Sequence, residues 1–174
     1  MKHFIYTSFV ILSVLAASIY GAAHDQISYT VSPEYFTHLK FSQFNLSWAM
    51  DSPRLGAATV GVLASWWMGV IIAIPLGVTG FLFKTPKQMA VYLIKSLFIT
   101  IGTAFTVALS GLLYAFMTIT KQDTADILWR VMPGVLDPVN FARVGTMHEA
   151  SYLGGILGVI AGMTYLLVCR FKTP

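Results

Sequence analysis

Residues 55–83 read LGAATVGVLASWWMGVIIAIPLGVTGFLF, 29 residues without one ionisable side chain. A helix that crosses a bilayer needs about 20 apolar residues, so this stretch predicts a transmembrane helix. Every fourth residue in it is small, and residues four apart lie on one face of a helix. In lipid, a face of small residues lets a second helix approach closely. This glycine-zipper stripe consists of Ala57, Gly61, Ser65, Gly69, Ala73 and Gly77.

Composition extends the prediction to the whole chain. Its 174 residues are 56% hydrophobic and only 10% charged, with a mean hydropathy of +0.72, whereas soluble domains are about a quarter charged. Four stretches are long enough to cross a membrane: Phe4–Ala23, Leu55–Phe83, Val91–Ile119 and Ala150–Cys169. We therefore predict a single all-α domain, residues 1–174, built as a four-helix transmembrane bundle with short periplasmic cap helices.

Small residues four apart recur in the other three predicted spans. The stripes are Ser13, Ala17 and Gly21 in the first, Gly102, Thr106 and Ser110 in the third, and Ala150, Gly154, Gly158 and Gly162 in the fourth. They predict close helix crossings and offer a surface for a protein partner or a homo-oligomer. The alternative is that glycine is simply common in membrane helices.

The first span has two interpretations. Lys2 before an apolar run that ends in Gly21-Ala22-Ala23 resembles a secretory signal with a cleavage site. The run is longer than a usual signal core, and it carries its own small stripe. We favour a retained membrane anchor over a cleaved signal peptide.

Charge predicts the orientation of the bundle. Six basic residues lie at the amino terminus, around the second connection and in the carboxyl tail: Lys2, Lys84, Lys87, Lys95, Arg170 and Lys172. All seven acidic residues lie in the other two connections, His24–Arg54 and Thr120–Glu149. The positive-inside rule therefore places both termini in the cytoplasm and these two connections outside it. The net charge of +4 is explained by this asymmetry, so no nucleic-acid partner is predicted.

The two outer connections carry signals for local structure. Ile27–Val31 alternates like a short extended piece. Ser32-Pro33-Glu34 has the pattern of a helix start, which predicts a helix from Pro33 to about Phe41. A second short helix is expected from Asp123 or Thr124 through Met132. A third should start at Asp137-Pro138 and run into the fourth span.

The apolar cores of the spans contain no Asp, Glu, His or Arg. Proton relays and ion paths are built from such residues. Their absence argues against a proton-coupled pump, an intramembrane aspartyl protease and a haem held by helix histidines. We predict no catalytic residue. Trp66-Trp67 in the second span is either an aromatic wall for a lipid, quinone or other ligand, or a filler of volume beside the small stripe.

One polar constellation lies at the predicted outer interface. His24-Asp25 closes the first span and His148-Glu149 opens the fourth, while Glu34 and His38 share a helix face. Imidazole and carboxylate groups together suit Zn, Mn or Fe. The candidate divalent-metal ligands are His24, Asp25, Glu34, His38, His148 and Glu149. The alternative is that they cap helix ends and pair with Arg54, Arg130 or Arg143.

Three strings carry a family resemblance: HDQISYTVSPEYFTHLKFSQF from His24, ASWWMG in the second span and MHEASYLGG entering the fourth. They resemble an uncharacterised family of small bacterial inner-membrane proteins, usually labelled as signal-peptide-containing or hypothetical membrane proteins. The resemblance implies a bacterial inner-membrane location. It implies no activity and no catalytic residue.

Taken together, the sequence favours a non-enzymatic integral membrane protein that acts by packing with lipid or with a protein partner. The alternative is a metal-dependent enzyme or a ligand-binding protein with a His/Asp/Glu site at the periplasmic interface. A transporter that forms its pathway by oligomerisation ranks third. A cavity that converges on the polar constellation would favour the alternative.

Overall fold

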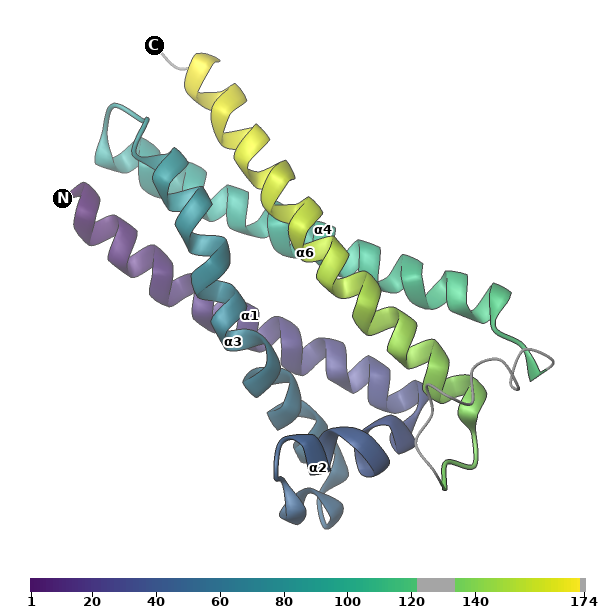
Figure 1. Cartoon of the computed structure of the whole chain (residues 1–174). Coiled ribbons are helices and arrows are strands. Elements are labelled where there is room, and N and C mark those ends of the chain that lie inside the picture. Colours follow the sequence, from purple (N-terminus) through teal and green to yellow (C-terminus); the bar gives the residue numbers. More distant parts are fainter. Residues whose placement is uncertain (122–133, 173–174) are drawn as a thin grey trace.

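The computed structural model describes residues 1–121 and 134–172, and its long elements are four helices (Figure 1). They are α1 (Lys2–Val31), α3 (Pro53–Gly80), α4 (Pro86–Thr118) and α6 (Pro138–Lys172). Each is long and apolar enough to cross a membrane. The predicted all-α bundle is therefore confirmed, and the chain has the helices of an integral membrane protein.

Two helix bounds bear on the site. Helix α1 continues beyond Ala23 to Val31, so the prediction of an extended piece at Ile27–Val31 is wrong. Tertiary packing favours the helix over the extended form, because Ile27 and Val31 contact a buried cluster that includes Met147 of α6. Helix α6 begins at Pro138, which confirms the predicted helix that runs from there into the fourth span.

Short helical turns cover one end of the bundle, which we call the cap end. They are η1 (Tyr35–Lys40, a π-helix), α2 (Phe41–Gln43) and η2 (Ser47–Met50, a 3-10 helix). The predicted helix from Pro33 to about Phe41 largely coincides with η1. Phe36 and Phe41 are buried in one cluster with Val60 and Val144, which fixes these turns on the ends of α3 and α6. The short helix predicted to end at Met132 lies outside the described residues.

The helices pack mainly as two pairs, α1 with α3 and α4 with α6 (Figure 1). In the first pair, Gly21 faces Gly61, and a Cβ atom built on either would lie under 3.0 Å from the other's backbone. Gly69 faces the backbone of Ser13 in the same way. The small stripe of α3 therefore lies at its crossing with α1, where the absence of side chains permits backbone contact.

The second pair uses the small stripe of α6. A Cβ on Gly154 would lie 2.9 Å from Cα of Ala104, and one on Gly158 would lie under 3.0 Å from the carbonyl oxygen of Thr100. At this approach the Thr100 hydroxyl donates a hydrogen bond of 3.0 Å to the carbonyl of Gly158. The same hydroxyl also donates to the carbonyl of Ser96 at 2.9 Å, so close packing adds an interhelical hydrogen bond to one within α4.

The stripe predicted for the third span faces the wrong way. A Cβ on Gly102 would meet nothing within 4 Å, and Thr106 and Ser110 are exposed. The face of α4 that packs on α6 carries Thr100 and Ala104 instead. Residues two apart on a helix diverge by about 200°, so only one of these stripes can face the partner helix.

Candidate functional site

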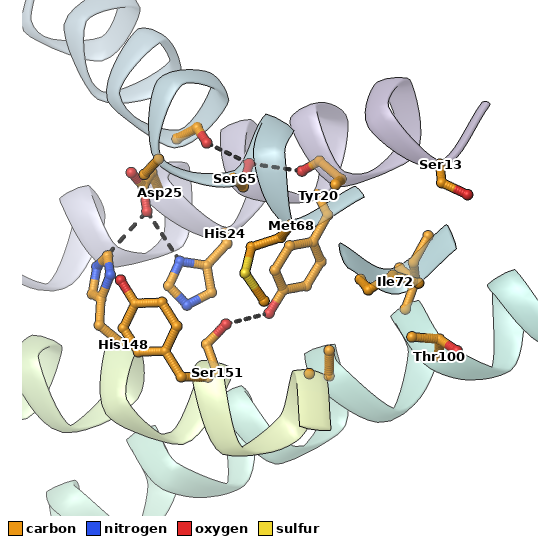
Figure 2. A pocket seen from close by; sticks show the side chains of 18 of the residues that line it. Ser13, Tyr20, His24, Asp25, Ser65, Met68, Ile72, Thr100, His148 and Ser151 are labelled. Atoms are coloured by element: carbon orange, nitrogen blue, oxygen red, sulfur yellow. Dashed lines mark hydrogen bonds and ion pairs between the residues drawn. The ribbon is translucent and has the colours of Figure 1, made fainter. Parts of the chain in front are cut away.

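A cavity of about 100 Å³ lies between the α1–α3 pair and the α4–α6 pair (Figure 2). Ile72, Leu97 and Ile101 line its apolar part. Its polar part lies toward the cap end and is lined by Tyr20, His24, Asp25, Lys40, His148 and Ser151. The cavity also touches Tyr152 of α6, which is 54% exposed.

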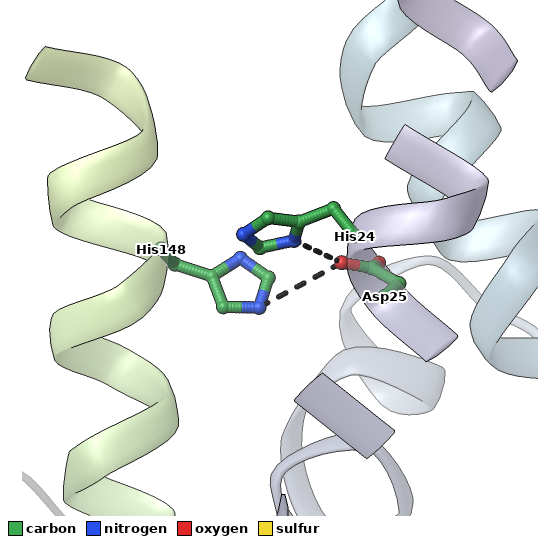
Figure 3. A group of neighbouring side chains, drawn as sticks. All are labelled: His24, Asp25 and His148. Atoms are coloured by element: carbon green, nitrogen blue, oxygen red, sulfur yellow. Dashed lines mark hydrogen bonds and ion pairs between the residues drawn. The ribbon is translucent and has the colours of Figure 1, made fainter. Parts of the chain in front are cut away.

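The polar part centres on two imidazoles and one carboxylate (Figure 3). His24 Nδ1 and Oδ1 of Asp25 are 3.0 Å apart and hydrogen-bonded. His148 Nε2 lies 3.7 Å from the same carboxylate oxygen. One ligand atom from each of the three residues lies within 4.8 Å of the others. Helix α1 supplies His24 and Asp25, and α6 supplies His148 from the opposite helix pair.

Aromatic rings hold the two imidazoles in place. The His24 and His148 rings meet edge to face, with centroids 4.7 Å apart at 83°. The Tyr35 ring of η1 stacks on His148 at 5.0 Å and 27°, so the cap end closes over the cluster. Tyr20, one turn before His24, shares a hydrogen bond of 2.7 Å with Ser151 of α6. These contacts restrict the rings without using all of their nitrogens.

Two buried ring nitrogens are left over. His24 and Asp25 are each only 3% exposed, and within the described residues Nε2 of His24 and Nε2 of His148 have no hydrogen-bond partner. A buried donor or acceptor without a partner costs about 1–3 kcal/mol. The Ser13 hydroxyl, which lines the same cavity, is also buried without a partner among the described residues. Three such atoms beside one cavity indicate a place where something binds.

The other three sequence candidates lie elsewhere. The Glu34 carboxylate accepts hydrogen bonds from the backbone N–H groups of Leu136 and Asp137, at 2.9 and 2.8 Å. It thereby fastens the start of η1 to the segment before α6. His38 lies 4.0 Å from Glu34 with its side chain 38% exposed, and Glu149 is exposed. The structure therefore brings together three of the six residues.

Of the arginines proposed as alternative partners, the two that the structure describes, Arg54 and Arg143, bind groups other than the cluster. Arg54 donates to the carbonyl of Gln26 at 3.2 Å and to the Thr30 hydroxyl at 2.9 Å. Arg143 donates to the carbonyl of Ile119 at 2.8 Å. Arg130 lies outside the described residues. Among the side chains described here, the carboxylate of Asp25 makes its ion-pair contacts with the imidazoles of His24 and His148.

Several lining residues were missed by sequence reasoning. Tyr20 precedes His24 by four residues and Ser151 follows His148 by three, so helical spacing could have pointed to both. Lys40 lines the cavity from η1, and Tyr35 of the same element stacks on His148; nothing in the sequence indicated that this segment is a π-helix over the cavity. Burial lowers the pKa of Lys40, although Asp25 partly opposes this. Burial likewise raises the pKa of the Tyr35 phenol.

The adjacent tryptophans do not form part of the site. Trp66 is 48% exposed and Trp67 is 42% exposed, and neither lines the cavity. Both rings therefore face outward from α3. Helix α3 lies at the edge of the bundle, so its outward face is wide enough for both rings.

Chemically, the cluster offers two imidazoles and a carboxylate at the polar end of an otherwise apolar cavity. Such a set can hold a divalent metal or the polar group of a ligand. Comparison with protein-family models, with curated proteins and with solved structures finds no match. The resemblance to small inner-membrane proteins stays an expectation, and function is inferred from the cavity and the His24–Asp25–His148 cluster.

Proposed function

We propose that this integral membrane protein binds an amphiphilic small molecule in the cavity between its two helix pairs. The polar group of the ligand lies against His24, Asp25 and His148, and its first carbon atoms lie among Ile72, Leu97 and Ile101. The observation that carries this proposal is one cavity that joins a polar cluster to an apolar interior. Sites for small molecules typically combine apolar walls with a few placed polar groups.

The cavity favours ligand binding over packing alone. A bundle that serves only to pack with lipid would be more stable if apolar side chains replaced the unpartnered imidazoles. At about 100 Å³ the cavity accommodates a head group and a short part of a chain. The rest of an acyl chain would leave beside Tyr152, a lining residue that is itself exposed. The proposal assigns no catalytic residue and no enzymatic activity.

The proposed location is the bacterial inner membrane with both termini in the cytoplasm. Besides the charge asymmetry of the sequence, basic residues of the two ends of the chain lie on the connection between α3 and α4, opposite the cap end. There Lys2 donates to the carbonyls of Phe81 and Phe83, at 3.2 and 2.5 Å, and Arg170 donates to that of Leu82 at 2.6 Å. In this orientation the polar end of the cavity lies toward the periplasmic side, under the cap end. Association with a second copy or another protein stays a prediction.

A photoactivatable palmitate, with a diazirine in its acyl chain, tests the proposal in purified protein. We expect labelling that unlabelled palmitate displaces and that maps to peptides lining the cavity. Ala64 lines the cavity, and Ala64→Phe would fill it, so displaceable labelling should fall by about tenfold, equivalent to about 1.4 kcal/mol.

Leu63→Phe is the matched control, because Leu63 is 40% exposed and lies outside the cavity. It should label like the wild type. Labelling that palmitate does not displace, or that Ala64→Phe leaves unchanged, would contradict ligand binding in this cavity.

A further inference from the structure

The three polar side chains at the end of the cavity have the spacing of metal ligands. A zinc ion lies about 2.0–2.2 Å from nitrogen and carboxylate ligands, so two donors on one ion are about 3–4 Å apart. Oδ1 of Asp25 is 3.0 Å from Nδ1 of His24 and 3.7 Å from Nε2 of His148. The remaining adjustment is small, because all three donors already lie within 4.8 Å of one another.

We propose that His24, Asp25 and His148 bind one divalent transition-metal ion, of the class to which Zn²⁺ belongs. This inference does not depend on the amphiphile proposed above, since it follows from the donor geometry and from the unpartnered Nε2 of His148. Nε2 of His148 is buried and accepts no hydrogen bond from any described residue. A metal ion would use that lone pair and would remove the free-energy cost of burying it.

The donor set also indicates the kind of site. Two imidazoles and one carboxylate suit Zn²⁺ and related ions rather than Mg²⁺ or Ca²⁺, which prefer oxygen ligands. Three protein ligands leave at least one coordination position free, whereas structural zinc sites are closed by four. The cluster lines the cavity (Figure 2), so the free position would face the space between the helix pairs.

Neighbouring side chains both favour and disfavour metal binding at the three ligands. Tyr35 stacks on His148, and His148 meets His24 edge to face, so the rings are oriented before an ion arrives, as in sites whose outer partners position the ligands. Lys40 lines the same cavity, and its cation repels a divalent ion. Lys40→Met should therefore tighten metal binding. In contrast, Asp25→Asn, which removes the negatively charged ligand, should weaken it.

Zinc binding by the purified full-length protein tests the inference with the metal alone. The protein is stripped with a chelator, equilibrated with Zn²⁺, separated from free ion and analysed for zinc. We expect one zinc per chain. His148→Asn and Asp25→Asn should each weaken binding by about 100-fold or more, since loss even of outer-shell partners typically costs 10–100-fold.

The chain supplies its own matched controls. His3 and His38 are the other two histidines, and both lie outside the cluster. His3→Asn and His38→Asn each remove one imidazole and should keep one zinc per chain. The inference is overturned if the wild type binds no zinc, or if these two variants lose zinc as completely as His148→Asn does.

A second variant keeps the test valid if His148→Asn fails to fold. In His148→Cys, made in a Cys169→Ser background, a thiolate replaces the imidazole and is itself a good ligand. Added Co²⁺ should then give a thiolate-to-cobalt charge-transfer absorption that the Cys169→Ser parent lacks. Folded His148→Cys protein without this absorption would overturn the assignment of His148 as a ligand.

Discussion

Substitution of Gly158 by alanine tests how the helix pairs are held together. The added Cβ would lie under 3.0 Å from the Thr100 carbonyl oxygen and 3.1 Å from Cα of the same residue. Ordinary van der Waals contact begins near 3.4 Å. These atoms belong to the backbone, so they cannot rotate away and α4 must move as a body. The movement also weakens the hydrogen bond of 3.0 Å from Thr100 to Gly158.

Two contributions lower the free energy of unfolding of Gly158→Ala. Overpacking of this kind costs about 1–3 kcal/mol, and an interhelical hydrogen bond in a membrane protein averages about 0.6 kcal/mol. Against them, alanine favours the helix over glycine by up to about 1 kcal/mol. Gly102→Ala isolates this last contribution, because a Cβ at Gly102 meets nothing within 4 Å. The free energies of unfolding of Gly158→Ala and Gly102→Ala should therefore differ by about 2–4 kcal/mol.

Reversible unfolding in mixed micelles, followed by circular dichroism as the denaturing detergent is increased, measures this difference. We expect Gly102→Ala to be at least as stable as the wild type and Gly158→Ala to be less stable. Equal stability of the two alanine variants would refute the account of the α4–α6 crossing, because it would show that α4 and α6 are not in backbone contact at Gly158.

Three further predictions concern the cap end and the first helix. Burial lowers the pKa of Lys40 in the folded protein below its usual 10.5. Between the folded-state pKa and 10.5 the unfolded chain binds more protons than the folded one, so the free energy of unfolding should rise with pH in that window. Lys40→Met should reduce this rise and be the more stable protein at neutral pH, and unfolding measured from pH 7 to 10 would show whether the two slopes differ. Glu34→Gln should lower the local stability at Leu136 and Asp137 by about 1 kcal/mol, which makes amide exchange there about fivefold faster; unchanged exchange would show that the carboxylate hydrogen bonds contribute nothing. Because α1 packs on α3 and lines the cavity, residues 1–23 should be retained, and an intact mass that lacks them would contradict this.

The sequence predicted the class of fold and much of its packing. Length and apolar composition were sufficient for the four helices, since few structures other than helices can satisfy the backbone in lipid. The stripe that contains Gly61 and the one that contains Gly158 both lie at helix crossings. The stripe at Gly102 does not, because α4 offers two candidate faces and only packing against α6 selects between them.

The site was predicted only in part, for a similar reason. His148 and Glu149 are neighbours that diverge by about 100° on a helix, and the sequence does not say which one points inward. The structure turns His148 toward the cavity and leaves Glu149 exposed. Glu34 and His38 do share a face, but the backbone amides before α6 bind the Glu34 carboxylate. Lys40 enters the cavity from a π-helix, whose form no periodicity in the sequence indicates.

The most direct test of the account is anomalous diffraction at the zinc absorption edge from crystals of the protein soaked in Zn²⁺. We expect one strong peak at the polar end of the cavity, about 2.0–2.2 Å from Asp25 and from a ring nitrogen of His24 and of His148. A map that shows both helix pairs but has no peak there, with the two rings turned away from each other, would contradict the proposed convergence of α1 and α6 on a binding site.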